Sequence, residues 1–386
     1  MRRVSITVAA LLATTSLAHA GGIDRSGQGV NILFEEGNYV QFTFANINPS
    51  VDGKADITAG GGSVIVGSTS ASDVAQTYNQ LSFGYKHELN ENWDLAVIVD
   101  QPFGAHVLYA DGPFSNIGSG GALPYDAEAD IDSRAITMLA QYNVGNGFSI
   151  HGGLRGLSVN GIIQSGDGIL DADSDYNWGG VVGVAYERPD IALRVALTYA
   201  TATNVDFDGT MSQLVAPGTL APSMPTDFTV EFPESVNLDF QTGVAPDTLL
   251  FGSVRWVGWG GFNLTTPGLA GDIEWVNFDD DTITYRLGIG RRLNEEWSVA
   301  LVAGYESAGT RPSTTALAPT TGSKSIGIAA TYTSPKNWVV SGGLEYVVPG
   351  DQYVTFAGPA GTDPVQKLEF NDNSAIAAGI RIGYRF

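Results

Sequence analysis

The sequence predicts a transmembrane antiparallel β-barrel of about 14 strands, with a short N-terminal plug in its lumen. Three observations support this fold class. Segments of alternating polarity recur through the chain, and short turns alternate with long connections between them. Glycine and aromatic residues are abundant, whereas charged residues make up only 16% of the chain. The last alternating segment ends the chain on an aromatic residue, Phe386.

The N-terminus has the composition of an export signal. Two arginines precede an apolar run over residues 4–17, and Ala18-His19-Ala20 forms a small-x-small cleavage site. The run is shorter than the ~20 residues that a membrane-spanning helix needs. A buried core helix is the alternative, but two glycines follow at once. We therefore expect residues 1–20 to be a signal peptide.

Composition excludes several classes of protein. The chain has no cysteine, so neither disulfides nor thiolate metal sites can form. Hydrophobic residues make up 43% of the chain, which is too much for an acidic disordered protein. Without Arg2 and Arg3, 17 of the 19 basic residues remain against 41 acidic ones. A basic surface for nucleic acid is therefore not expected.

The alternating segments predict an even number of strands, which closes a sheet without leaving an edge in lipid. Tight connections such as 88–94 and 292–298 are typical of hairpin turns and place a Trp near the turn. Long connections such as 104–130 and 349–373 are predicted to be external loops, which leaves both termini on the periplasmic side. We expect strands to begin near Tyr39, Asn79, Trp93, Arg134, Phe148, Tyr176, Ile191, Ser235, Leu249, Thr282, Trp297, Ser323, Trp338 and Ser374.

Residue parity separates a lipid face from a lumen face. Leu81, Phe83 and Tyr85 share one parity, and small or charged residues share the other. Aromatic residues gather at the turn end, as in an interfacial girdle. They are Tyr85, Trp93, Tyr142, Phe148, Tyr186, Trp297, Tyr332, Trp338, Tyr384 and Phe386. A soluble two-sheet sandwich is the alternative, and it predicts no girdle.

Parity also predicts charged side chains in the lumen. They are Arg155, Arg194, Arg255, Arg286, Arg381 and Arg385, and the acids Asp94, Asp100, Glu187, Asp239, Glu306 and Glu345. We expect most of these charges to pair and stiffen the barrel. Arg155, Arg255 and Arg286 lie at mid-strand or above, which makes them candidates for binding a ligand carboxylate.

Residues 21–37 precede the first strand and show no alternation. A barrel of this size is too wide for strand side chains alone to fill, so we interpret this segment as a plug, or hatch. Its apolar residues Leu33 and Phe34 are candidate ligand contacts. A disordered periplasmic tail is the alternative. The predicted division is 1–20 signal peptide, 21–37 plug and 38–386 barrel.

The third predicted strand is interrupted. Clean alternation from Trp93 to Asp100 is followed by Gln101-Pro102-Phe103-Gly104. Proline cannot donate to the ladder, and glycine at this place favours a bulge. Spacing alone leaves two interpretations open, a break in the barrel wall or a strand that ends at Asp100.

Four stretches, 37–53, 81–109, 232–262 and 284–306, resemble in order and spacing a known family of outer-membrane transporters for long-chain fatty acids and other hydrophobic compounds, the FadL type. The resemblance implies a fourteen-stranded barrel with an N-terminal hatch. It also implies a lateral gate where the third strand kinks inward. Here the kink would comprise Asp100, Gln101, Pro102, Phe103 and Gly104. The hatch departs from the family, because it is short and lacks an Asn-Pro-Ala stretch.

The resemblance implies passive uptake of long-chain fatty acids or other hydrophobic molecules across the bacterial outer membrane, through an apolar lumen slot and the lateral gate. A water-filled general porin is the first alternative, and a membrane-bound enzyme or a purely structural barrel is the second. The four histidines show no paired metal spacing and no nucleophile motif stands out, so no catalytic residue, metal or cofactor is expected.

The expected partners are a hydrophobic small-molecule ligand, outer-membrane lipid and lipopolysaccharide, and the barrel-assembly machinery. The resemblance implies that this machinery recognises Tyr384 and Phe386 in the last strand. No nucleic acid is expected, and the protein is predicted to be a monomer.

Overall fold

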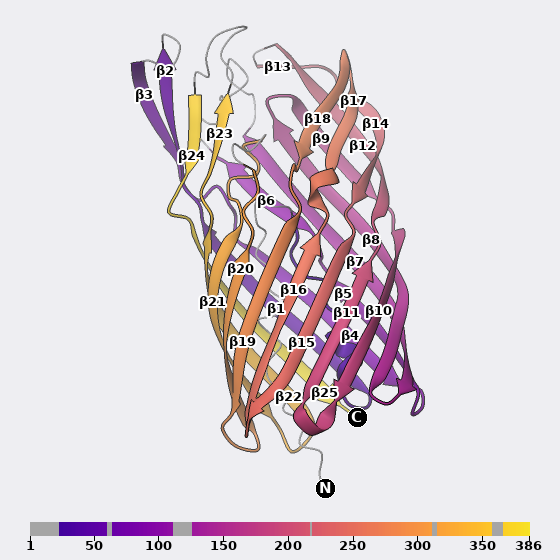
Figure 1. The fold of residues 1–386 in the computed structure, drawn as a ribbon. Helices are drawn as coiled ribbons and strands as arrows, with labels where there is room; N and C mark the ends of the chain where they lie inside the picture. The colour runs from indigo at the N-terminus through magenta and orange to yellow at the C-terminus, as the bar shows by residue number, and fades with distance from the viewer. Residues whose placement is uncertain (1–22, 60–63, 111–125, 217, 311–314, 357–365) are drawn as a thin grey trace.

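The computed structural model describes residues 23–59, 64–110, 126–216, 218–310, 315–356 and 366–386. The predicted signal peptide lies outside these residues. Fourteen strands form a closed antiparallel barrel, because the first strand pairs with both its neighbour and the last strand (Figure 1). They are β1 (Tyr39–Ser50), β4 (Tyr78–Glu88), β5 (Trp93–Asp100), β7 (Ala127–Gly145), β8 (Phe148–Ser165), β10 (Asn177–Arg188), β11 (Leu193–Ala200), β15 (Ser235–Ala245), β16 (Thr248–Val257), β19 (Thr282–Arg292), β20 (Trp297–Glu306), β21 (Ser323–Thr333), β22 (Trp338–Pro349) and β25 (Ser374–Arg385).

The predicted alternation is confirmed by the exposure of the side chains. Leu81 and Phe83 on β4 are 48% and 42% exposed, whereas Gln80 and Lys86 on the same strand are 7% and 4% exposed. A row of apolar side chains this exposed is stable only when it contacts lipid, because its exposure to water would be unfavourable. The polar row faces the lumen, where its charges find partners.

The predicted aromatic residues lie in cross-strand pairs at the turn end of the barrel. Ring centroids are 4.8 Å apart for Trp93–Tyr142, 4.6 Å for Phe148–Tyr186, 5.2 Å for Trp297–Tyr332 and 4.8 Å for Trp338–Tyr384. Amphipathic rings of this kind concentrate at the boundary between lipid and water. The C-terminus lies at this same end (Figure 1).

Most of the long connections are not simple loops, and this part of the prediction is wrong. They contain further strands, which extend the barrel sheet or pair with one another in separate sheets. These strands are β2 (Gly53–Ala59), β3 (Val64–Ala71), β6 (Gly104–Tyr109), β9 (Gly168–Ser174), β12 (Thr203–Ala216), β13 (Thr219–Leu220), β14 (Met224–Phe232), β17 (Asn263–Gly268), β18 (Gly271–Asn277), β23 (Gln352–Phe356) and β24 (Gln366–Phe370). β2, β3, β23 and β24 form a separate sheet above one side of the barrel (Figure 1).

One strand boundary also differs clearly from the prediction. β7 begins at Ala127, seven residues before the expected start near Arg134. The added residues alternate, but their outward side chains are acidic, as in Asp130 and Asp132. Above the membrane this face meets water, so no apolar row marks the strand.

Helical structure in the described chain is limited to short 3₁₀ turns. They are η2 (Asn31–Phe34), η4 (Pro189–Ile191) and η5 (Trp259–Gly261). No helix among the described residues has the length and apolar character needed to cross a membrane.

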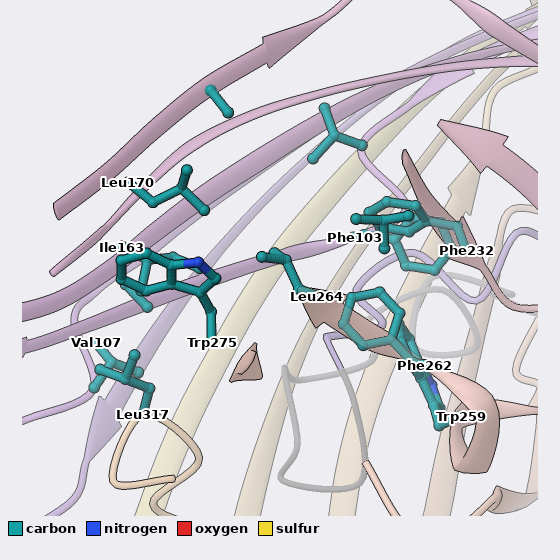
Figure 2. Close-up of a cluster of buried hydrophobic side chains, with 14 of the residues drawn as sticks. Phe103, Val107, Ile163, Leu170, Phe232, Trp259, Phe262, Leu264, Trp275 and Leu317 are labelled. Atoms are coloured by element: carbon teal, nitrogen blue, oxygen red, sulfur yellow. The ribbon is translucent and has the colours of Figure 1, made fainter. Parts of the chain in front are cut away.

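A large apolar cluster fills the outer half of the lumen. Its side chains come from many strands and from the inward-pointing connections (Figure 2). Phe103 is part of it, with its ring centroid 5.1 Å from that of Phe232 and 5.7 Å from that of Trp259. Other members include Val107, Ile163, Leu170, Phe262, Leu264, Trp275 and Leu317. The third strand thus contributes directly to the core.

We predict that deleting Phe386 lowers the yield of folded barrel. The Phe386 N–H donates to the Asn38 carbonyl at 3.0 Å, and its ring lies 6.1 Å from Tyr384 and 6.4 Å from Tyr85. Deletion removes these contacts and the proposed assembly signal. The measurement is the amount of heat-modifiable protein in outer-membrane fractions. Phe386→Tyr is the control, because it keeps the ring. Equal yields for the deletion and the wild type would contradict the assignment.

Candidate functional site

The barrel wall is interrupted on one side of the third strand. Within the described residues, pairing between β4 and β5 stops at Phe83 and Val99. On its other side the strand continues to pair with β7, first as β5 and then, from Gly104, as β6. We call the unpaired region between residues 78–82 and residues 100–105 the wall break. The third strand therefore resumes as β6 beyond Asp100. This agrees with the interpretation of a break in the barrel wall and not with a strand that ends at Asp100.

A bulge produces the wall break. Between the pairs Asp100–Ala135 and Gly104–Asp132, three residues of this strand face two residues of β7. The extra residue reverses the facing, so that even-numbered side chains such as Asp100 point inward before the bulge and odd-numbered ones such as Phe103 after it. Bulges of this kind bend a strand and end its pairing on one side.

Side chains bind backbone groups that the bulge leaves without a strand partner. Ser133 Oγ accepts the Phe103 N–H at 2.8 Å and donates to the Phe103 carbonyl at 2.6 Å. Gln101 Oε1 accepts the N–H of Leu81 on β4 at 2.9 Å. Such bonds are needed at lipid depth, where no water can serve instead.

The N-terminal segment also pairs with the bulge. Arg25 N–H donates to the Pro102 carbonyl at 2.7 Å, and Gly104 N–H donates to the Ile23 carbonyl at 2.8 Å. Asp24 and Phe103 form an antiparallel bridge between these two bonds. Residues 23–25 therefore act as a short extra strand on the inner side of the wall break.

Lumen charges hold the rest of this segment. Arg255 Nε donates to Asp24 Oδ2 at 2.6 Å, and Arg155 hydrogen-bonds to the side chain of Gln28. At the periplasmic end, Arg385 Nη2 lies 2.9 Å from Glu35 Oε2. The guanidinium of Arg194 stacks on the Phe34 ring, 4.7 Å from its centroid. Ser26 Oγ donates to Asp100 Oδ2 at 2.5 Å. Lys86 Nζ donates to the Glu35 carbonyl at 2.6 Å. Inward-facing charges from several strands thus converge on one short segment.

The three arginines predicted to bind ligand all have protein partners in this structure. Arg155 and Arg255 contact the N-terminal segment, and Arg255 also donates to Asn237 at 2.7 Å. Arg286 Nη2 lies 2.9 and 2.8 Å from the two oxygens of Glu345. The structure therefore brings the first two together around one segment and places the third in a separate ion pair. Their role in ligand binding stays a prediction.

Leu33 and Phe34 lie on the lumen side of the segment. Leu33 is 1% exposed and packs with Val30, Ile32 and Tyr39 in a small apolar cluster. Phe34 is half-buried beside this cluster and beneath Arg194. Both residues line the cavity below the segment, and their role as ligand contacts stays a prediction.

A cavity of about 1130 Å³ occupies the periplasmic half of the lumen. Its lining is mixed, with apolar Ile32 and Phe34 beside charged groups such as Glu187 and Arg381. The cavity also reaches the wall break, where its lining includes Gln80, Leu81, Ser82 and Asp100. The N-terminal segment thus separates the apolar outer cluster from an inner cavity with a more polar lining.

Sequence reasoning did not single out two features of this site. One is Arg25, whose neighbours depend on where a non-periodic segment folds. The other is a group of possible metal ligands, with His106 Nε2 3.4 Å from Asp130 Oδ1 and 3.3 Å from Asp132 Oδ1. The register of β6 with β7 brings these three together, because His106 pairs with Asp130. The chain spacing of the histidines carries no signal for it.

A closed barrel with a lipid-facing apolar band, an apolar outer lumen and a broken wall defines the class of outer-membrane channels for hydrophobic compounds. Residues 32–386 match the family described as outer membrane protein transport protein (OMPP1/FadL/TodX), and the chain belongs to this family. It is therefore an outer-membrane transport protein for hydrophobic compounds. A comparison with curated protein sequences finds no significant match.

Solved structures agree with this assignment at the level of the fold. A FadL homologue of Pseudomonas aeruginosa superposes with a TM-score of 0.72 at 12% identity, with 92% of each chain covered. The Pseudomonas putida toluene transporter TodX gives 0.66 at 13% identity, with 91% of each chain covered. The Ralstonia pickettii toluene transporter TbuX gives 0.59 at 14% identity, covering 91% of this chain and 90% of the other.

We predict that Arg255→Ala loosens the N-terminal segment and raises ion conductance. The change leaves the Asp24 carboxylate without its buried partner, and breaking such a pair costs at most about 3–5 kcal/mol. The measurement is conductance of the purified protein in planar bilayers. Arg286→Ala is the matched control, because it also removes a lumen arginine from a buried ion pair, here with Glu345 on the barrel wall. If both variants conduct like the wild type, the Asp24–Arg255 pair does not hold the segment in place.

Proposed function

We propose that the protein carries long-chain fatty acids or other hydrophobic small molecules passively across the outer membrane, and releases them sideways through the wall break. The observation that supports this most is the wall break itself, lined by the cavity and covered from inside by residues 23–26. The ligand would first enter the apolar cluster in the outer lumen. It would then pass the N-terminal segment and leave between β4 and β6.

The depth of the wall break suits a lateral exit. Leu81 borders it on β4 and is 48% exposed on the lipid-facing side. Further out, Asn46 and Asn79 form an exposed polar pair at 2.9 Å, which suits the level of the headgroups. Beyond that level, Gln76 N–H donates to the His106 carbonyl at 2.8 Å, so backbone pairing resumes. An apolar molecule leaving here enters hydrocarbon and avoids the cost of exposure to periplasmic water.

A general porin for polar solutes is less compatible with this lumen. The outer half contains a packed apolar cluster, and the segment from Asp24 to Glu35 crosses the lumen below it. A porin of similar strand number instead keeps a polar, water-filled channel. A plugged barrel predicts low ion conductance, whereas a porin predicts steady conductance.

The ligand itself is not decided by these features. Two of the similar structures are described as toluene transporters, and one as a FadL homologue, so aromatic hydrocarbons and fatty acids are both candidates. We propose Leu33 and Phe34 as apolar contacts in the cavity. Ligand binding by Arg155, Arg255 or Arg286 would require the ligand to displace Gln28, Asp24 or Glu345.

We predict that closing the wall break abolishes most uptake without harming the fold. Replacing Gln101-Pro102-Phe103 by the two residues Thr-Val removes the extra residue, so that the strand can pair continuously with both β4 and β7. Relief of the bulge should leave heat-modifiable folding at least as high as in the wild type. The measurement is uptake of a radiolabelled long-chain fatty acid and of toluene by cells that express each form.

Pro102→Ala is the matched control for this variant. It keeps three residues opposite two and keeps the Pro102 carbonyl position that accepts Arg25 N–H, so uptake should stay near the wild-type rate. If the shortened variant folds and still transports at the original rate, the ligand passes down through the segment rather than through the wall.

A further inference from the structure

The side chain of Arg25 fills the wall break. Its guanidinium lies against the backbone of Gly104, where a Cβ atom would collide with it. The guanidinium also stacks on the Tyr78 ring of β4, with its carbon 4.1 Å from the ring centroid. Arg25 thus bridges the two strands that the bulge has separated, and only glycine at position 104 leaves room for it.

At least three of the five N–H groups of this guanidinium are unused. Nη1 donates to Asp132 Oδ1 at 3.2 Å, but Nε and Nη2 are buried and have no hydrogen-bond partner among the residues that the structure describes. The side chain is only 2% exposed. A buried charged donor without an acceptor is costly, so an arrangement of this kind indicates a missing acceptor.

The two unused donors have the geometry of a carboxylate receptor. Nε and Nη2 lie on one edge of the planar guanidinium and present two parallel N–H groups. That edge matches the two oxygens of a carboxylate and binds them through paired charge-assisted hydrogen bonds. A neutral hydrocarbon offers no acceptor to either donor.

We propose that Arg25 is a binding site for the carboxylate headgroup of an amphipathic ligand as it passes the wall break. The proposal rests on the proposed lateral route and adds the chemical class of ligand that this route favours. The carboxylate binds Nε and Nη2 while Nη1 keeps Asp132. The hydrocarbon tail then lies towards the lipid-facing side of β4, where Leu81 is exposed.

The cavity ends close to Arg25, and the site is suited to transient binding. The cavity lining includes Ser26, the next residue in the chain, and Gln80, two residues from Tyr78 on β4. Asp132 already offsets part of the Arg25 charge. Asp130 lies near Asp132, because His106 Nε2 contacts both carboxylates. Partial neutralisation weakens the hold on an anion, and a transport pathway needs sites that a ligand can leave.

The test compares ligands that differ only in the headgroup. Full-length protein purified in a non-ionic detergent is titrated with dodecanoate and with methyl dodecanoate, and the dissociation constants are measured by native mass spectrometry. The wild type should bind dodecanoate about tenfold or more tightly than the ester, because the ester carries no charge to pair with the guanidinium. Arg25→Met should lose this preference and keep the affinity for the ester.

Two further variants make the test specific. Arg188→Met removes an exposed arginine paired with Asp190 in a periplasmic turn, so it should keep the full preference. Gly104→Ala puts a Cβ where the guanidinium lies, so it should reduce the preference while Arg25 is still present. Both variants are first checked for heat-modifiable folding.

Three results would overturn the proposal. They are a wild type that does not prefer dodecanoate to its ester, an Arg25→Met variant that keeps the preference, or a more than tenfold preference for dodecyl phosphate over dodecanoate. If Arg25→Met fails to fold, Gly104→Ala still tests the site, because it displaces the guanidinium while Arg25 is present, and an unchanged preference in that variant would also overturn the proposal. Uptake of toluene tests the lateral route separately, because it needs no headgroup site.

Discussion

Every backbone polar group at the depth of the lipid must find a hydrogen bond within the protein, and the rest of this structure depends on that constraint. Twelve of the fourteen junctions around the barrel meet it with antiparallel ladders along the lipid-facing band, whereas the two junctions of the third strand, with β4 and with β7, are interrupted near residues 101–103. There the acceptors and donors come from Gln101, Ser133 and the backbone of residues 23–25. A break in the wall and a segment folded into the lumen are therefore two parts of one solution.

The lumen charges serve the same arrangement. A segment without regular secondary structure loses much conformational freedom when it is ordered, and backbone pairing over three residues offsets little of that loss. Asp24, Gln28 and Glu35 extend the contact along the segment, because arginines on three separate strands meet them. These arginines contact the segment directly. Removing one of them would therefore first change the position of the segment, and any effect on ligand binding would follow from that.

The sequence predicted the barrel well because lipid imposes a simple rule on every second residue. Trp297, Ser323, Trp338 and Ser374 begin strands where the alternation placed them. The rule fails beyond the membrane, so alternation does not predict the outer part of β7 or the outer hairpins. The alternation rule also carries no information about Arg25. The contacts of this residue with Gly104 and Tyr78 join three segments that are distant in the sequence.

The small sheet of β2, β3, β23 and β24 has a consequence for how the barrel closes. β1 and β25 come from opposite ends of the chain and form the seam, which is the junction with the longest sequence separation. β2 follows β1 and β24 precedes β25, and these two strands pair with each other outside the membrane. Contacts between distant segments form slowly, because the entropy of loop closure is lost before any contact is gained. The small sheet, which forms in water at the outer end, keeps β1 and β25 close to each other. The ladder between these two strands can then form from a contact that already exists.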